Sequence, residues 1–515
     1  MILINSSPKD ALRIFQPFLP IYVPVGAGCL IAYLRREGIE ADLVDEQIEK
    51  DTIGKISLYA KKIRDPYIFA FSVLTAAFKE SILLSLELRK RYPNSIIVFG
   101  GIHPTAMPDE VLSYSHIDIV IRGEGERPLA ELYRCIKNRR DYSHINGLSY
   151  REKGKVVNNP VSAEVEALDS YPRFPYEIFD PTKYDLGFVA SSRGCPYRCI
   201  FCSNRITTGR KYRYHSSAKI ADDLELLYKK YGKKNVLFLD DNFLVSKERV
   251  YDLIDEIKKR GLHKVMIFNF QARGDNVTYP LLKDLYDAGF RSIFFGIETA
   301  SERIMKTIKK DETVAQCIEA VRMAKETGFH VSATFIYGLP GETHKDRNDA
   351  LHLSRDLKLD MVRYNNATPY PGTELYEIAK KENRLFVQGL YENFISVSSF
   401  IENPFKKIPF SYVPDGNTER EIRNDILYSY LVFYLDFKRL RSIFTNPEKG
   451  VGWFNAGEKF RDLLKKCPAI CLLFFILIIK FAKLFLDRSK DSRLYWHANE
   501  LKGRMESRGE YDQKA

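Results

Sequence analysis

The sequence predicts an α/β protein with two successive parallel-sheet units and a helical C-terminal region. Two observations carry this prediction. Short apolar runs alternate with amphipathic helical segments over residues 1–142, and the same alternation resumes over residues 187–400. Such alternation is typical of parallel strands joined by helices. The 515-residue chain, with 45% hydrophobic residues, is long enough for about three domains. We assign the third region to residues 401–515.

Composition and charge limit the kinds of partner and the compartment expected for this protein. The net charge of +12 suits nucleic acid, an anionic lipid surface or acidic small molecules, and does not choose among them. Residues 1–5 lack the basic segment and long apolar core of a secretory signal. Eight cysteines in a long chain of this kind suit a reducing compartment. We therefore expect a cytoplasmic protein.

The first unit, residues 1–142, is predicted to be a doubly wound parallel sheet. The expected strands are residues 2–4, 41–44, 67–71, 95–99 and 117–121. Ligands of such sheets bind on the loops that follow the strands. The informative loops are 72–75, 100–105 and 123–126, where glycines allow a ligand to approach the backbone. Paired glycines are also common in tight turns, and residues 124–126 also suit the first turn of a helix.

A hairpin and a linker are expected over residues 143–186. Two short strands flank a polar turn near residue 153, and four prolines then punctuate the chain. In the second unit the expected strands are residues 188–191, 236–239, 265–269, 292–296, 331–337 and 361–365. Six parallel strands make an incomplete barrel, whose chemistry is expected at their carboxyl ends.

Three cysteines follow the first strand of this second unit. Cys195, Cys199 and Cys202 have three and then two residues between them. Cysteine thiolates are the usual ligands of iron–sulfur clusters, and a four-iron cluster normally takes four of them. Three would leave one iron open for a substrate. A zinc knuckle or buried structural cysteines are the alternatives, although no second cysteine pair of zinc-finger spacing follows.

With Tyr197 and Phe201 between them, these cysteines resemble the cluster loop of the radical S-adenosylmethionine (SAM) superfamily. The resemblance implies a 4Fe-4S cluster that binds SAM at its open iron and cleaves it reductively to a deoxyadenosyl radical. It also implies further SAM contacts at the other strand ends, with helix capping as the alternative for the acidic residues. These SAM-binding candidates are Tyr197, Phe201, Asp240, Arg273, Glu298, Ile336 and Gly338.

The loops of the first unit, taken together, resemble the cobalamin-binding domain that precedes many radical SAM domains. The implied cobalamin contacts are Ser72, Thr75, Gly100, Gly101, His103, Thr105, Glu124 and Gly125. One departure matters. None of the nine histidines has an aspartate two residues before it, so the Asp-x-His-x-x-Gly pattern is absent. We therefore expect cobalamin to be held without a histidine on cobalt.

The C-terminal region contains a predicted helix at 419–444 and an apolar run at 468–479. This run is shorter than the ~20 residues that span a bilayer, and basic residues flank it. An interfacial helix on anionic lipid is one interpretation, and a buried helix is the other.

Together these features predict a cobalamin-dependent radical SAM enzyme that methylates an unactivated carbon of a hydrophobic small molecule. The alternatives are an oxidative cyclase related to the anaerobic cyclase of chlorophyll biosynthesis, an enzyme whose first domain is empty scaffolding, and a non-catalytic cobalamin- or cluster-binding sensor. The expected partners are an electron donor such as flavodoxin or ferredoxin and, through the apolar run, a membrane surface. Nucleic acid is not expected.

Overall fold

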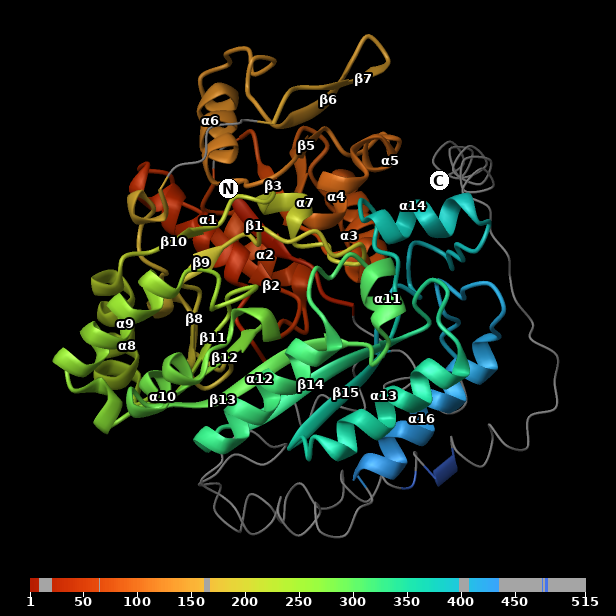
Figure 1. The fold of residues 1–515 in the computed structure, drawn as a ribbon. Coiled ribbons are helices and arrows are strands. Elements are labelled where there is room, and N and C mark those ends of the chain that lie inside the picture. The colour runs from red at the N-terminus through yellow and green to blue at the C-terminus, as the bar shows by residue number, and fades with distance from the viewer. Residues whose placement is uncertain are drawn as a thin grey trace.

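The computed structural model describes residues 1–8, 21–63, 65–161, 167–397 and 407–434, together with 475, 478 and 479. Two sheets organise these residues. In Figure 1 the N-terminal sheet, red to orange, lies above the green second sheet, and the blue helix α16 (Glu419–Tyr434) covers the far side of the second unit.

The first sheet has the strand order β2-β1-β3-β4-β5-β6-β7. Its strands are β1 (Ile2–Asn5), β2 (Asp42–Asp45), β3 (Ile68–Ser72), β4 (Ile96–Gly100), β5 (Ile119–Ile121), β6 (Leu148–Glu152) and β7 (Lys155–Asn158). The helices between them are α1 (Val25–Arg36), α2 (Thr52–Ala60), α3 (Phe78–Arg91), α4 (Ile102–Ala106), α5 (Pro108–Leu112) and α6 (Glu126–Lys137). Strands β1 to β5 are parallel, as predicted.

The hairpin β6–β7 belongs to this sheet. β6 pairs antiparallel with β5, and β7 pairs antiparallel with β6. The sequence analysis grouped the hairpin with the linker because pairing between distant strands leaves no local signal. The first unit therefore extends to the end of β7.

The second sheet has six parallel strands in the order β15-β14-β13-β12-β11-β8. The strands are β8 (Phe188–Val189), β11 (Asn235–Phe238), β12 (Ile267–Ala272), β13 (Phe290–Glu298), β14 (His330–Tyr337) and β15 (Met361–Asn366). The helices are α8 (Ser217–Tyr231), α9 (Lys247–Lys259), α10 (Tyr279–Asp287), α11 (Glu302–Thr307), α12 (Val314–Thr327), α13 (His344–Asp356) and α14 (Glu374–Lys381). This is the predicted incomplete barrel.

The first strand of the second sheet is shorter than the sequence predicted. The chain leaves the sheet after Val189, and β9 (Ser192–Arg193) pairs antiparallel with β10 (Arg213–Tyr214) in a small ribbon. The short helix α7 (Arg205–Thr208) lies between β9 and β10 along the chain. The ribbon and α7 therefore frame the cysteine loop.

One hydrophobic core runs through both units. It contains Phe69 and Phe99 from the first sheet and Phe238, Phe268 and Phe290 from the second. Apolar side chains of parallel strands are buried on both faces, which explains why these strands read as continuous apolar runs.

Part of the C-terminal prediction lies outside the residues that the structure describes. Helix α16 begins at the predicted residue and is described to Tyr434, whereas the run 468–479 lies, apart from three residues, outside the described part of the chain. Within the described part, no helix combines the length and the apolar character needed to span a membrane.

Candidate functional site

The cysteine loop is anchored at its start by a fully buried carboxylate. Asp240, just after β11, accepts hydrogen bonds from the backbone amides of Ser191 (2.9 Å) and Ser192 (2.7 Å) and from the Ser191 hydroxyl (2.5 Å). The buried Arg249 guanidinium completes the set at 3.0 Å. Both oxygens are thus bound by the protein. Asp240 thus positions the chain that enters the cysteine loop, and its contact with SAM stays a prediction.

The middle of the loop is held from both sides. The amide of buried Ile200 donates to the Ile308 carbonyl (3.1 Å), and the Leu375 amide donates to the Ile200 carbonyl (2.9 Å). Phe201 packs against the core. This anchoring fixes the positions of the cysteines on either side of Ile200.

The three thiols lie near enough to one another to interact electrostatically. Burial raises the pKa of Cys195, Cys199 and Cys202. The pKa of Cys202 rises to about 11, and the charges of the other two thiols contribute to this increase. Among the described residues, no three His, Cys, Asp or Glu side chains converge as a single metal ion would require. A four-iron cluster binds each cysteine through a different iron atom, so its ligands need not converge on one point. The loop fits such a cluster.

Arg273 lies against this loop. Its guanidinium stacks 3.6 Å from the centre of the Tyr197 ring, and its Nη1 lies 4.0 Å from Cys199 Sγ. The guanidinium fork of Arg273 donates to Asp275 at 2.9 and 3.0 Å, and its contact with the SAM carboxylate stays a prediction. In this structure Arg273 supplies positive charge beside the thiols.

A buried charge cluster extends this positive region. Lys310 Nζ lies 3.1 Å from Glu298 and 3.5 Å from Glu312, and Glu312 lies 3.9 Å from Arg273. Burial by itself would lower the pKa of Lys310. The negative charges of Glu298 and Glu312 outweigh this effect, so the pKa lies above its ordinary value. Lys310 therefore stays charged and, with Arg273, opposes the effect of burial on the Cys199 pKa.

Sequence reasoning found Glu298 and missed Lys310 and Glu312. Glu298 follows a strand, whereas the other two belong to the charged run 309–312, which has no feature that signals burial. Glu298 has a positive φ of 69°, and the pairing register of β13 shifts between Gly296 and Glu298. This irregularity turns the Glu298 carboxylate toward Lys310.

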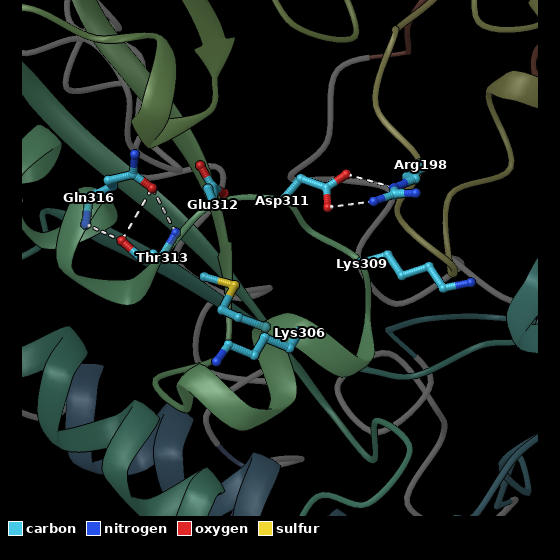
Figure 2. Close-up of a pocket in the computed structure, with 8 residues that line it drawn as sticks. Arg198, Lys306, Lys309, Asp311, Glu312, Thr313 and Gln316 are labelled. Carbon is cyan, nitrogen blue, oxygen red and sulfur yellow. Dashed lines mark hydrogen bonds and ion pairs between the residues drawn. The ribbon is translucent and has the colours of Figure 1, made fainter.

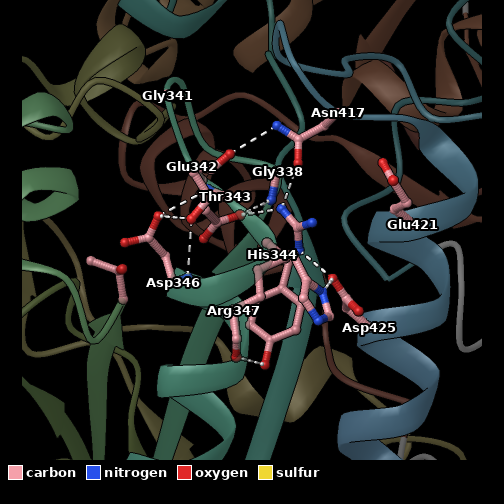
Figure 3. A network of polar contacts seen from close by, with 12 residues as sticks. Gly338, Gly341, Glu342, Thr343, His344, Asp346, Arg347, Asn417, Glu421 and Asp425 are labelled. Atoms are coloured by element: carbon pink, nitrogen blue, oxygen red, sulfur yellow. Dashed lines mark hydrogen bonds and ion pairs between the residues drawn. The ribbon is translucent and has the colours of Figure 1, made fainter.

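The predicted adenine-binding turn follows β14, which carries Ile336 near its end. Gly338, Gly341 and Glu342 of this region are drawn in Figure 3. The Gly338 amide, at φ 84°, donates to the buried carboxylate of Glu342. Burial raises the pKa of Glu342 to about 8, against the opposing charge of Arg347 at 3.6 Å. A side chain at Gly338 would come within 3.2 Å of Ile422 on α16.

Helix α16 holds this turn in place. Arg347 Nε donates to Asp425 on α16 (2.6 Å), and Arg347 Nη1 donates to Asn417 (2.8 Å). Asn417 in turn donates to the Glu342 carbonyl (2.8 Å). The C-terminal region therefore contacts the presumed SAM site through side chains that the sequence analysis did not single out.

The predicted cobalamin loops meet at the carboxyl edge of the first sheet. Ser72 and Gly100 end β3 and β4, Thr75 is buried in the turn before α3, and Gly125 precedes α6. Thr105 Oγ1 donates to the Gly101 carbonyl (2.7 Å) and accepts from the Gly123 amide (3.1 Å).

Gly101 has a local explanation. Its φ is +101°, and a Cβ there would come within 2.9 Å of the Val73 backbone. The glycine thus permits close approach of two loops, in agreement with the tight-turn alternative, and its contact with cobalamin stays a prediction.

His103 is the best indication that these loops receive a polar group. Its side chain is fully buried between Phe78 and Tyr391, whose ring centres lie 4.1 and 4.8 Å away. Neither ring nitrogen has a hydrogen-bond partner among the residues that the structure describes, and burial lowers the pKa of the ring to about 3. A buried polar group without a partner is costly. Polar atoms of a bound cofactor would supply the missing partner, so the site fits cobalamin.

Glu124 is engaged elsewhere. Its carboxylate pairs with Arg213 and, at 3.4 Å, with Arg193, while Glu126 pairs with Arg193 at 2.7 Å. Both arginines lie on the ribbon beside the cysteine loop. Glu124 thus links the first unit to the second, and its contact with cobalamin stays a prediction.

The two sets of loops face each other. Helix α4, which carries His103, packs on α7, which follows Cys202. A Cβ at Gly372 would come within 3.0 Å of both Ala106 on α4 and Ile206 on α7. The loops of the first sheet, the cysteine loop and the end of β15 thus meet in one region (Figure 1).

Comparison with known families agrees with this geometry. Residues 16–133 match the B12 binding domain, and residues 189–354 match the radical SAM superfamily. An uncharacterized methyltransferase of Pyrococcus horikoshii is 32% identical over 418 residues, which cover 80% of this chain and 88% of that protein. The chain belongs to the cobalamin-binding radical SAM methyltransferase family. As a member it uses a 4Fe-4S cluster, SAM and cobalamin.

Other members of the family differ in activity. The anaerobic magnesium-protoporphyrin IX monomethyl ester cyclase of Cereibacter sphaeroides is 26% identical, covering 76% of this chain and 64% of that protein. Hopanoid C-3 methylase of Methylococcus capsulatus is 24% identical, covering 74% of each chain. The cobalamin-dependent radical SAM enzyme OxsB, solved with aqua-cobalamin, has the same fold, with a TM-score of 0.65, 19% identity, and coverage of 98% of this chain and 84% of that one.

Proposed function

We propose that this radical SAM enzyme transfers a methyl group to an unactivated carbon of a hydrophobic small molecule. The observation that supports this proposal is the contact of α4 with α7, which brings the cobalamin loops next to the cysteine loop. Direct transfer between two cofactors and one substrate requires the three to be held together in a reactive geometry. A hopanoid methylase among the relatives supports a lipid-like substrate.

Specific roles follow for residues of this chain. Cys195, Cys199 and Cys202 would hold the cluster, which when bound supplies the electron that cleaves SAM. Arg273 and Lys310 would balance the negative charge of the thiolates, since their own charges act on Cys199. The His103 ring would form a hydrogen bond with a polar atom of cobalamin. The turn at Gly338 would lie against the SAM adenine.

The remaining predictions concern domains and partners. We infer a radical SAM unit over residues 187–400 and a helical region over 401–515, with an electron donor such as flavodoxin or ferredoxin. Peripheral membrane contact through residues 468–479 would be supported by flotation with anionic liposomes and contradicted by its absence.

A second candidate reaction is oxidative cyclisation without methyl transfer. The cyclase of Cereibacter sphaeroides among the relatives favours it. The two reactions differ in the fate of the methyl group of SAM, which makes them separable by product mass.

The test is turnover of the anaerobically reconstituted protein with methyl-labelled SAM, a reductant, and candidate isoprenoid lipids and porphyrin esters. Label in the product supports methyl transfer, and an unlabelled product that has lost hydrogen supports cyclisation. Replacing the three loop cysteines with alanine is expected to abolish deoxyadenosine formation, whereas Cys135→Ala is not. Bound cofactors without any deoxyadenosine from the native protein would contradict both reactions and favour a sensor.

A further inference from the structure

A pocket opens on the outer side of the cysteine loop (Figure 2). It has a volume of about 400 Å³ and lies between the loop, α11 and the start of α12. Its lining residues are Arg198, Met305, Lys306, Lys309, Asp311, Glu312, Thr313 and Gln316. Glu312 joins this pocket to the buried charge cluster beside the cysteine loop.

We propose that this pocket is the docking surface for a small acidic one-electron donor protein. The inference rests on the proposed function, because only a cluster that must be reduced needs such a partner. It goes further by assigning the surface that the donor uses.

The first support is the short path from the pocket to the thiols. Arg198 precedes Cys199 directly, and the end of α11 is joined to the loop by the hydrogen bond from Ile200 to Ile308. On the pocket floor, Glu312 lies 3.9 Å from Arg273, whose Nη1 lies 4.0 Å from Cys199 Sγ. One side chain therefore separates the floor of the pocket from a cluster ligand.

The second support is the charge of the side chains that line the pocket. Three cations line it, and the side chains of Arg198 and Lys309 are 57% and 44% exposed. Asp311 binds Arg198 at 2.9 and 3.3 Å. Lys309 pairs with Glu374.

Lys306 adds a charge that these pairs do not neutralise. Its side chain is exposed and forms no ion pair or hydrogen bond with the residues that the structure describes. Arg210 adds further positive charge close enough to lower the pKa of Asp311. Arg198, Arg210, Lys306 and Lys309 together exceed Asp311, Glu312 and Glu374 by one positive charge. This excess favours an acidic partner, since complementary charge speeds association.

The proposed step is a single electron transfer. The flavin or iron–sulfur group of the donor is oxidised by one electron, and the cluster held by the cysteine loop is reduced by one. No bond forms between the two proteins, so the docked complex dissociates after transfer.

The test compares Lys306→Glu with Lys258→Glu. Both lysines are exposed, lie in the last turn of a helix and have no partner among the described residues, so the variants share their change in net charge and in helix-end charge. Cluster reduction by reduced flavodoxin is followed by stopped-flow absorbance at low salt, and binding of oxidised flavodoxin by calorimetry. Lys306→Glu should slow reduction and weaken binding about 5-fold or more relative to Lys258→Glu, and high salt should remove the difference.

Reduction by dithionite separates docking from other effects. It needs no protein surface, so the two variants should be reduced by dithionite at the same rate. Equal rates with flavodoxin, or an equal slowing with both reductants, would overturn the docking surface. A cluster that flavodoxin reduces in this way while no substrate gains a methyl group would contradict the proposed reaction and leave the docking surface standing.

Discussion

Buried charged side chains decide the form of the cysteine loop at the scale of single residues. Asp240 and Arg249 are 0% and 1% exposed and bind each other at 3.0 Å. Removing one partner of a buried pair leaves the other charge uncompensated, which costs far more than the pair itself contributes. The loop therefore depends on a carboxylate that contacts no cysteine.

Asp240→Asn is expected to lower the free energy of unfolding by about 3–5 kcal/mol, because the amide leaves the Arg249 charge unpaired. Chemical denaturation followed by circular dichroism measures this change. Asp241 follows Asp240 in the chain and accepts fewer hydrogen bonds. Asp241→Asn should therefore lower the free energy of unfolding by about 1 kcal/mol or less. A variant of Asp240 that folds normally but binds SAM weakly would support the predicted SAM contact.

Glu110 should give the protein a pH-dependent stability. Burial raises the pKa of its carboxyl from 4.5 to about 7, although the Tyr391 hydroxyl donates to it at 2.6 Å. The folded state then holds more protons than the unfolded state between these values, so stability falls as pH rises through this window.

Glu110→Gln should remove this contribution, so the melting temperature of the variant should change less than that of the native protein between pH 5 and pH 8. Scanning calorimetry at the two values measures the difference. Equal pH dependence in the two proteins would show that Glu110 is ionised normally in the fold.

At the scale of elements, α16 acts as a support for the turn at Gly338. The helix lies outside the barrel strands, yet Asp425 and Ile422 contact Arg347 and Gly338, which follow β14. Pre-organised loops bind ligands more tightly because less ordering is required on binding. The C-terminal region thus supports the proposed SAM-binding turn without contributing to the sheet.

Asp425→Asn is therefore expected to weaken SAM binding about 10-fold, or about 1.4 kcal/mol, with the cluster content unchanged. Equilibrium dialysis with the reconstituted protein measures the affinity, and iron analysis measures the cluster. Glu421→Gln is the control, since Glu421 caps the same helix through Thr418 and does not contact the turn. Equal affinities of the two variants would contradict the support role.

At the scale of the whole molecule, charges join the two cofactor units. Arg193 lies two residues before Cys195 and binds Glu126 at the start of α6. The Glu126 side chain is only 6% exposed. Any shift of the first unit relative to the second would strain the entry to the cysteine loop.

Arg193→Gln should raise amide hydrogen exchange at the start of α6 and in the β9–β10 ribbon about 10-fold or more, because it leaves a largely buried carboxylate unpaired. Exchange measured by mass spectrometry tests this. Arg35→Gln breaks the exposed pair with Glu177, at 49% and 53% exposure, and should change exchange little. Similar exchange in both variants would mean that the units are held together by apolar packing alone.

The sequence by itself determined the two parallel sheets and the family. Strands buried on both faces are continuous apolar runs, so β3, β4 and β14 lie within one or two residues of their predicted positions. The cysteine spacing was equally local, since three ligands on one loop need no information from distant residues.

Only the tertiary structure decided what the charged residues do. Asp240, Arg273 and Glu124 follow strands as binding residues do, yet their partners are Ser191, Asp275 and Arg193 in this fold. Lys310 and Glu312 are buried although they belong to a charged run. The pairing of a charge depends on which distant groups the fold brings within a few ångströms, and residue type and spacing along the chain do not contain that information.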